Sequence, residues 1–556
     1  MPCHVQSDEK HHAIFRLTLS AEMAYAFCRK LTMQFVRKDL VAMIDTRFSR
    51  RYFFYGSLLA AGAPQAGSGA TSSLPTAKYK SVTDKLNVAV VGQGLRGSQI
   101  VIGAAASENI TALCEVDDDR MARSANIYTK AAKYRDFRQM LDKEGKNIDA
   151  VMIAVPDHLH TPIALLCMQH GKHVYCEKPL TRTVSEARLL NEAAAKYKVA
   201  TQMGNQGFSH EGTKTACEIV WSGEIGDVTE VHAWTGGVTG GKLDVPESGL
   251  PEQPVPETLA WDLWLGPAAA RPYNPLITRS WRPMHDFSLG GSLGDWLVHI
   301  MGPAHLALQL GTVSPISVEC VRKEPLNRWL WPWRAHTVIE FPKRGSMPPL
   351  KVHLHQNERG DFPNPPGMAE DEPLFPRPNN LADRGRPFVD SGDGVMAVGE
   401  QITLDGKRVP PPPRAGFPGG GRGGRAAQVP DDPALRSPGN GSVFVGTKGY
   451  LATTARGEGV ALLPASRWAE YKLPPQLLLR GVNHQQDWIR ACKGGAPGVS
   501  HFPVATRYLE WLALATVAQE IPGRLLWDAQ NMRFSNNQEA NKLLTPYVRK
   551  GWEMKL

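Results

Sequence analysis

The chain has 556 residues, of which 42% are hydrophobic and 21% charged, a composition typical of a globular protein with room for two or more domains. Its net charge is +9, but residues 1–51 hold nine Lys/Arg against five Asp/Glu and so account for +4 of it. The net charge of +5 on the remaining residues is too small to indicate a nucleic-acid partner. The eight cysteines show no CxxC spacing and are interpreted mainly as small buried apolar residues.

Residues 1–70 have the pattern of an export signal. Arg50 and Arg51 precede an apolar run, Tyr52–Ala63, which suits the h-region of a twin-arginine signal and is too short to cross a bilayer. Small residues near its end offer A-x-A cleavage sites, and a buried N-terminal helix is the alternative. The pattern predicts export by the twin-arginine machinery to the periplasm, with a mature chain that begins near residues 64–72.

Residues 84–204 alternate between strand-like and helix-like segments, which predicts a doubly wound parallel sheet. The first strand, in LNVAVVGQG, ends in a G-x-G-x-x-G turn. In such turns the glycines allow a tight turn, close approach of the backbone to a pyrophosphate, and close helix–strand packing. Asn109–Asp119 and Ile148–Pro156 are predicted as the second and third strands. The nucleotide-binding residues expected in the turn are Gly92, Gly94, Leu95, Arg96 and Gly97.

Glu115 is the candidate for binding the adenosine ribose. It lies 18 residues after Gly97, near the spacing usual for that acid. A carboxylate there would repel a 2′-phosphate, so NAD is favoured over NADP, which stays possible. The alternative is that Glu115 and Asp117–Asp119 only cap the next helix.

After Gly204 the alternation stops and a second domain, residues 205–556, is predicted. Segments such as VTEVHAWTG, HTVIEFP and LKVHLHQ are typical of strands separated by turns. Residues 357–441 interrupt this domain with proline- and glycine-rich sequence, which predicts a surface loop without a core of its own.

Four motifs carry a resemblance to a known family. GQGLRG, AVPDHLHTPIA, GKHVYCEKPL and GDWLVHIM occur in this order, as in the Gfo/Idh/MocA oxidoreductases, and TQMGNQGFSHEG resembles an exported subgroup. The likeness runs from about residue 84 to the C-terminus. It implies a Rossmann domain followed by an α+β domain with an open, mainly antiparallel sheet, a homo-oligomer (dimer or tetramer), NAD(P), and a sugar or polyol substrate.

The resemblance also implies the reacting groups. The E-K-P motif falls on Glu177, Lys178 and Pro179, where Lys178 would bind the substrate hydroxyl near the nicotinamide. Asp295 and His299 share one side of a predicted helix, with His299 as acid/base and Asp295 as substrate anchor and orienter of the ring. Without the resemblance these would be an exposed turn and a surface pair. Further cofactor residues implied are Pro156, Asp157, His158, His160 and Glu177, further substrate residues are Asn205, Gln206, His210 and Trp234, and no metal site is implied.

Three functions follow as hypotheses. The first is an NAD(P)-dependent oxidoreductase that transfers hydride between a secondary alcohol carbon of a sugar, polyol or sugar derivative and a tightly bound nicotinamide. The second is an NAD-dependent glycosidase or lyase that works by transient oxidation and elimination. The third is a non-catalytic carbohydrate-binding protein. Tight retention of the cofactor is expected because free NAD is scarce outside the cytosol.

Overall fold

The computed structural model describes most of the chain after residue 78, namely residues 79–358, 439–480 and 483–556, scattered positions from 362 to 386, and two short strands, β11 (Gln401–Ile402) and β12 (Arg408–Val409). All of these residues lie in one compact unit, Leu58–Leu556. The predicted export signal and the proline- and glycine-richest part of the insertion lie outside the described residues. Within the described part of the chain, no helix is both long enough and apolar enough to span a bilayer.

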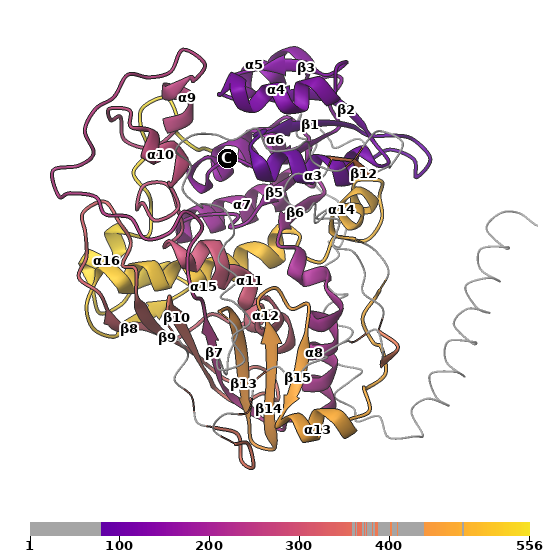
Figure 1. Cartoon of the computed structure of the whole chain (residues 1–556), viewed down its shortest axis with the longest axis vertical. Helices are drawn as coiled ribbons and strands as arrows, with labels where there is room; N and C mark the ends of the chain where they lie inside the picture. Colours follow the sequence, from indigo (N-terminus) through magenta and orange to yellow (C-terminus); the bar gives the residue numbers. More distant parts are fainter. Residues whose placement is uncertain are drawn as a thin grey trace, which may run out of the picture. The chain divides into compact units, whose positions relative to one another are not determined.

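The first half of this unit is a parallel six-stranded sheet in the order β3-β2-β1-β4-β5-β6, at the top of Figure 1. This confirms the predicted doubly wound fold. Its strands are β1 (Asn87–Val91), β2 (Asn109–Cys114), β3 (Ala132–Tyr134), β4 (Ala150–Ile153), β5 (His173–Glu177) and β6 (Thr201–Gly204). Its helices are α3 (Leu95–Ala105), α4 (Asp118–Ile127), α5 (Phe137–Glu144), α6 (His160–Gln169) and α7 (Val184–Tyr197).

Strand β3 is a correction to the sequence prediction, which made Ile148–Pro156 the third strand. That segment contains β4, and the extra strand is the tripeptide Ala-Lys-Tyr at the edge of the sheet. A strand of three residues with no apolar run is too short to show the alternation of apolar and polar residues that distinguishes a strand from a loop.

The second half is a nine-stranded sheet in the order β15-β14-β13-β7-β10-β9-β8-β16-β17. Only β7 and β10 pair in parallel among its described ladders, so the expected mainly antiparallel sheet is confirmed. Its strands are β7 (Val228–Trp234), β8 (Ser317–Lys323), β9 (Ala335–Phe341), β10 (Leu350–Gln356), β13 (Gly441–Gly446), β14 (Gly449–Thr454), β15 (Val460–Leu463), β16 (Leu525–Asp528) and β17 (Arg533–Phe534).

Helices from the C-terminal part of the chain join the two sheets. Helix α15 (Phe502–Glu520) contacts α7 of the first half and β8 and β9 of the second. Helix α14 (His484–Cys492) packs on α3, and its Trp488 and Cys492 enter the core of the parallel sheet. The remaining helices are α8 (Glu211–Ser222), α9 (Trp261–Leu265), α10 (Pro275–Arg279), α11 (Val298–Ile300), α12 (Gly302–Ala307), α13 (Ala465–Glu470) and α16 (Gln538–Lys542).

The first part of the proline- and glycine-rich segment packs against the second sheet, a contact that its composition did not predict. Met368 and Leu374 are 7% and 2% exposed and pack with Trp234 in a hydrophobic cluster on the second sheet. These apolar residues precede the PPPP and GGG tracts. The average composition of the whole segment therefore gives no indication that a short part near its start covers the sheet.

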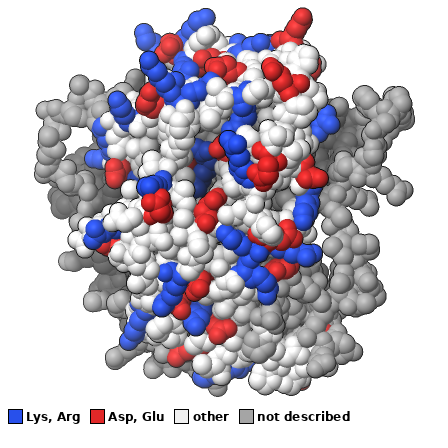
Figure 2. Space-filling view, turned by 90° about the vertical axis from the view of Figure 1, so that its left-hand side faces the viewer, with Lys and Arg blue, Asp and Glu red and all other residues white. Residues whose placement is uncertain are grey.

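Charge is mixed on one face of the molecular surface. On the face shown in Figure 2, Lys and Arg are interspersed with Asp and Glu. The described cysteines are free, and all but the partly buried Cys320 are buried, in agreement with their interpretation as small core residues.

Buried histidines predict how stability depends on pH. Burial lowers the pKa of His173 to about 4 and that of His305 to about 3. Both rings accept a hydrogen bond at Nδ1, as only a neutral imidazole can, from the Ala200 amide at 3.0 Å and from Nε1 of Trp511 at 3.4 Å. Both pKa values lie below ~6.5 for an unfolded histidine, so the unfolded state takes up protons first as the pH falls. The contribution of these histidines to the free energy of unfolding is fully present above about pH 6.5. As the pH falls from there toward the folded pKa values, each histidine loses roughly 1.4 kcal/mol of this contribution per pH unit.

We therefore expect the melting temperature to be lower at pH 5 than at pH 7.5, as measured by scanning calorimetry. Asp157 acts in the opposite direction. Burial raises its pKa to about 7, so this one carboxyl group stabilises the folded state more at low pH than at high pH. Unchanged melting between these pH values would contradict the assignment of the two histidines as buried and neutral.

Candidate functional site

Two cavities meet at the carboxyl edge of the parallel sheet. The smaller, of about 70 Å³, lies over β2 and β4, and the larger, of about 400 Å³, extends between β5 and the second half of the unit. They share Gly94, Arg120, Ala154, Val155 and Pro156 in their walls. The shared wall makes them neighbouring parts of one cleft, at the edge where doubly wound sheets bind ligands.

The glycine-rich turn forms the floor between the cavities. Gly92 has φ +90°, and a Cβ there would lie 2.3 Å from the main-chain oxygen of Ala154. A Cβ on Gly97 would lie 1.9 Å from the main-chain oxygen of Gly92, which is the close packing predicted for the third glycine. The turn leads into α3, whose N-cap Gly94 has no side chain to cover the helix end. An open helix N-terminus of this kind fits the pyrophosphate of a dinucleotide.

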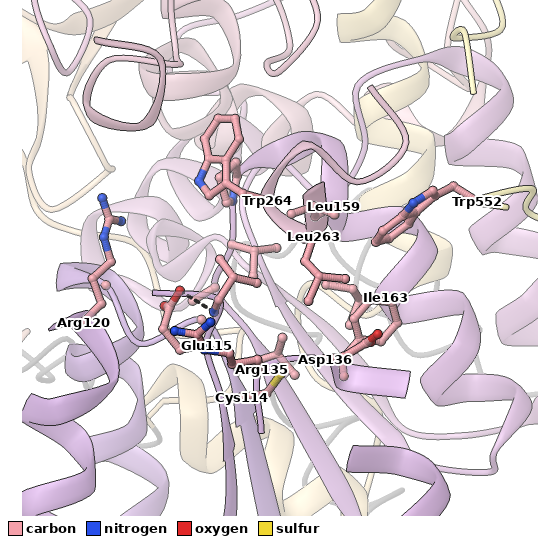
Figure 3. A pocket seen from close by; sticks show the side chains of 18 residues that line it. Cys114, Glu115, Arg120, Arg135, Asp136, Leu159, Ile163, Leu263, Trp264 and Trp552 are labelled. Atoms are coloured by element: carbon pink, nitrogen blue, oxygen red, sulfur yellow. Dashed lines mark hydrogen bonds between the residues drawn. The ribbon is translucent and has the colours of Figure 1, made fainter. Parts of the chain in front are cut away.

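The smaller cavity holds Glu115 at its rim (Figure 3). One carboxylate oxygen accepts a hydrogen bond from the amide of Gln93 at 2.7 Å and the other from the amide of Val116 at 2.8 Å. Burial raises the pKa of Glu115, while the Gln93 amide, the charge of Arg120 and the Asp117 amide oppose the shift. The cap of α4 is Asp117, which accepts from the amide of Asp119 at 3.0 Å, so Glu115 itself is not the cap residue.

Apolar side chains complete the smaller cavity. Leu159, Ile163, Leu263 and Trp264 line it opposite the carboxylate, as the close view shows (Figure 3). An apolar slot with a carboxylate at its rim suits an adenosine, whose ribose hydroxyls donate to the acid. The residues present therefore fit NAD along the whole cleft.

Lys178 lies in the wall of the larger cavity, directly after β5. Its Nζ donates hydrogen bonds to the main-chain oxygen of Asp295 at 2.7 Å and to Oδ1 of the same residue at 3.1 Å. Burial lowers the pKa of Lys178, and the Asp295 carboxylate opposes this shift. An ammonium group held in this way is suited to donate a hydrogen bond to a ligand oxygen.

The Asp295 carboxylate is fixed from several sides. Besides Lys178, Oδ1 lies 3.2 Å from Nε of Arg282, and Oδ2 accepts a hydrogen bond from the amide of Thr239 at 2.6 Å. Burial alone would raise the pKa of Asp295, but the two cations and the amide lower it below its ordinary value. Asp295 is therefore ionised at neutral pH and positions both cations.

The segment from Asp295 to His299 is not the regular α-helix that the sequence predicts. Leu293–Leu297 form a π-helical turn, and the short helices α11 and α12 follow it. A π turn has a wider hydrogen-bond spacing than an α turn, so the expected alignment of residues four apart does not apply. The described contacts of the Asp295 carboxylate are with Lys178, Arg282 and Thr239. The prediction that Asp295 orients the His299 ring is therefore wrong, and a different residue does so.

That residue is Asn205. Its Nδ2 donates to the main-chain oxygen of Val298 at 2.9 Å, which turns Oδ1 toward Nδ1 of His299 at 2.8 Å. Because an amide oxygen only accepts, Nδ1 carries the proton and Nε2 keeps its lone pair. Burial, followed by the charges of Lys178 and Arg456, lowers the pKa of His299 well below its ordinary value. The ring is thus a neutral base in the wall of the larger cavity.

The residues that follow β4 divide into two groups. Pro156 and Asp157 line the larger cavity, whereas His158 and His160 line neither cavity, which corrects their assignment as cofactor residues. Nε2 of His158 lies 2.9 Å from the main-chain oxygen of Trp264, and the two ring nitrogens of His160 lie 2.7 and 2.9 Å from those of Pro179 and Val155. The 3₁₀ turn Asp157–Leu159 buries these rings, where they brace the loops around the site.

The expected substrate residues also divide. Gln206 lines the larger cavity, but Asn205, His210 and Trp234 do not. Nδ1 of His210 contacts the main-chain oxygen of Arg456 at 3.1 Å, so this ring lies behind a cavity residue. Trp234 is 2% exposed and belongs to the hydrophobic cluster on the second sheet, because its position on β7 faces the covering segment.

Several cavity residues were not expected from the sequence. They come from loops, helix α10 and the π-helical turn of the second domain, and from the turn between β14 and β15, and contacts between distant segments bring them to the cavity. These residues are Thr239, Thr278, Arg279, Trp281, Arg282, Ser288, Trp296 and Arg456.

Comparison with known proteins agrees with this geometry. Residues 86–205 match the family model described as "Oxidoreductase family, NAD-binding Rossmann fold", and residues 218–338 match the model "Oxidoreductase family, C-terminal alpha/beta domain". The two matched ranges contain the glycine-rich turn, Lys178, Asp295 and His299.

Three similar proteins illustrate the range of relatives. A levoglucosan dehydrogenase of Pseudarthrobacter phenanthrenivorans is 23% identical over 44% of this chain and 56% of its own. In Saccharopolyspora erythraea, an inositol 2-dehydrogenase is 32% identical over 26% of this chain and 44% of its own. A glycosyl hydrolase family 109 protein of the same organism is 31% identical over 33% of this chain and 44% of its own. The chain thus spans about half the length of the curated relatives it matches.

Proposed function

The chain belongs to the Gfo/Idh/MocA family of NAD-binding oxidoreductases, and from this premise we propose that it oxidises a secondary alcohol of a sugar, polyol or sugar derivative. One observation carries the proposal. Lys178, Asp295 and His299 meet in the wall of a single cavity of about 400 Å³ that continues into the slot fitted to NAD.

The proposed roles follow from the hydrogen bonds. His299, neutral and with its Nε2 lone pair free of the Asn205 contact, accepts the proton of the substrate hydroxyl. Lys178 donates a hydrogen bond to the same oxygen, and Asp295 holds the ammonium group in place. Bound NAD supplies the hydride acceptor.

The charge of the larger cavity favours an acidic substrate. Six cationic side chains line it against three carboxyl groups. Two of the cations pair with Asp295, and Arg96 pairs with Glu177 at 3.0 Å. Arg279 and Arg456 add further positive charge to the wall. We therefore propose a sugar or polyol that carries a carboxylate or a phosphate.

Arg279 gives this proposal a test. In the Arg279→Gln variant we expect kcat/KM for a uronic acid to fall by about 10-fold or more, because a charge-assisted hydrogen bond is worth roughly 1.5–3 kcal/mol. The value for the matching neutral sugar should stay within about twofold. Steady-state NADH formation measures both, and Arg123→Gln, at an exposed position of α4 outside both cavities, is the matched control. An equal loss for both sugars would contradict the acidic-substrate proposal.

The glycosidase mechanism stays a second candidate, favoured by the similarity to a glycosyl hydrolase family 109 protein. Both reactions need the base and the nicotinamide, so only the products separate them. A panel of free sugars, sugar acids and glycosides, followed by NADH absorbance and product mass, decides between them. An oxidised product with NADH supports the dehydrogenase, whereas bond cleavage without net NADH supports the glycosidase. Absence of turnover across the panel would favour a binding protein.

We propose, finally, that the protein is exported to the periplasm with its nucleotide already bound. The twin-arginine pattern at Arg50 and Arg51 supports this, since that pathway carries folded proteins. Fractionation of cells that produce the full chain should then recover it in the periplasm with NAD retained through gel filtration. Recovery in the cytoplasm, or only in nucleotide-free form, would contradict the proposal.

A further inference from the structure

Four histidines gather on one face of the nine-stranded sheet, away from the residues that line the two cavities. His232 of β7 lies opposite His353 of β10, and His355 of β10 lies opposite His336 of β9. Residues two apart on a strand share a face, so His353 and His355 project to the same side. The strands supply these side chains from three separate segments of the chain, which explains why no metal-like spacing is visible in the sequence.

The rings lie close enough to share a ligand. Nδ1 of His232 and Nε2 of His355 are 3.4 Å apart, and one ligand atom from each of His232, His353 and His355 lies within 4.8 Å of the others. Zinc–nitrogen bonds of ~2.0–2.1 Å in a tetrahedral site place two nitrogens about 3.3 Å apart. The first pair already has this spacing. The His353 ring, stacked on His232 at 4.2 Å between centroids, has to turn to aim at the same point.

Unsatisfied nitrogens are the second observation. Nε2 of His353 and Nδ1 of His355 are buried without a hydrogen-bond partner in the described part of the chain. Leaving a buried polar atom unpaired is costly, and a metal ion would satisfy Nε2 of His353. If Nε2 of His355 binds the same ion, Nδ1 of that ring carries the proton and faces the Glu358 carboxylate, 3.6 Å away. Burial favours the neutral form of imidazole, which is the form that binds metals.

The surroundings supply negative charge. Oε2 of Glu230 lies 3.1 Å from Nε2 of His232, and Oε1 of Glu358 lies 3.6 Å from Nδ1 of His355. Carboxylates beside ligating histidines orient the rings and raise their basicity. The ring of Phe362, from the segment that covers the sheet, lies 5.6 Å from the His232 ring and limits access of water.

We propose that His232, His353 and His355 bind one divalent first-row transition-metal ion, of which Zn²⁺ is the best-suited probe. The ion would join β7 to β10 at the start of the covering segment. None of these three residues lines either cavity, so its effect is on stability and not on the chemistry of the larger cavity.

The test uses the full chain purified without a histidine tag and treated with EDTA. Titration with Zn²⁺ in a calorimeter should give one ion per chain, with a rise in melting temperature. Co²⁺ in place of Zn²⁺ should give the visible absorption of a site with nitrogen ligands. Less than about 0.2 ion per chain at saturation, or binding without any thermal shift, would overturn the proposal.

Variants locate the site. His353→Gln and His355→Gln should each abolish stoichiometric binding, while His170→Gln, a partly buried histidine at the end of α6, should bind as wild type. Melting of each variant in EDTA shows that it is folded before metal is added. Equal binding by wild type and both sheet variants would place the ion elsewhere and contradict the assignment. Because NADH formation is measured separately, failure of the metal site leaves the proposed oxidoreductase function untouched.

Discussion

Replacing His299 by alanine is expected to lower kcat by about 10²- to 10⁴-fold, the usual contribution of a general base. The ring is neutral and buried, with Nδ1 bonded to Asn205 and Nε2 available. No other described histidine lines the larger cavity, so no second imidazole is placed to replace it. NAD binding, measured by quenching of protein fluorescence, should change by less than about twofold. A His299→Ala enzyme with kcat within fivefold of wild type would contradict the role.

The pH profile separates a base from a merely structural histidine. Since burial lowers the pKa of His299, the acidic limb of kcat/KM should lie below pH ~6.5 and activity should fall as His299 becomes protonated. In Asn205→Asp, a carboxylate beside Nδ1 stabilises the protonated ring, and the limb should move to higher pH. The main-chain oxygen of Val298 keeps its hydrogen bond from the Tyr508 hydroxyl at 2.8 Å, so the variant is expected to fold. An unmoved limb would remove Asn205 from its positioning role.

Local sequence patterns predicted the parts of the fold that depend on neighbouring residues. The glycine-rich turn after β1 is such a part, because Gly92 and Gly97 are required by contacts within a single strand–turn–helix unit and with β4. Lys178, placed by the resemblance, lies in the cavity wall where it was expected. The parallel order of the first sheet followed from the alternation of strands and helices.

Contacts between distant segments could not be predicted in this way. The partner of His299 is Asn205, which reaches it from the turn after β6, and the π turn at Leu293–Leu297 has no apolar periodicity that differs from an α-helix. The same holds for the sheet histidines, which come together only when β7, β9 and β10 pair. The order and register of the strands determine which side chains meet at such sites, and a local sequence motif predicts neither of them.

The second large effect is expected at Lys178. In Lys178→Met, kcat/KM should fall by about 10²- to 10³-fold, the loss measured when one donor to a developing oxyanion is removed. The Asp295 carboxylate keeps Arg282 at 3.2 Å and the Thr239 amide at 2.6 Å. The buried charge therefore remains compensated, and the protein should fold. Stopped-flow measurement of NADH formation gives the rate, and a melting temperature close to wild type shows that the loss is not one of folding.

Asp295→Asn tests how the lysine is held. The carboxylate opposes the lowering of the Lys178 pKa by burial, so its removal lowers that pKa further. Lys178 must be protonated to donate its hydrogen bond, and activity is lost as the pH rises through its pKa. The alkaline limb of kcat/KM should consequently move to lower pH in Asp295→Asn, while Gln99→Ala, at the edge of the same cavity, should leave it in place. A limb that stays fixed in Asp295→Asn would mean that the lysine does not titrate in catalysis, and the carboxylate would then act only by fixing the position of the ammonium group.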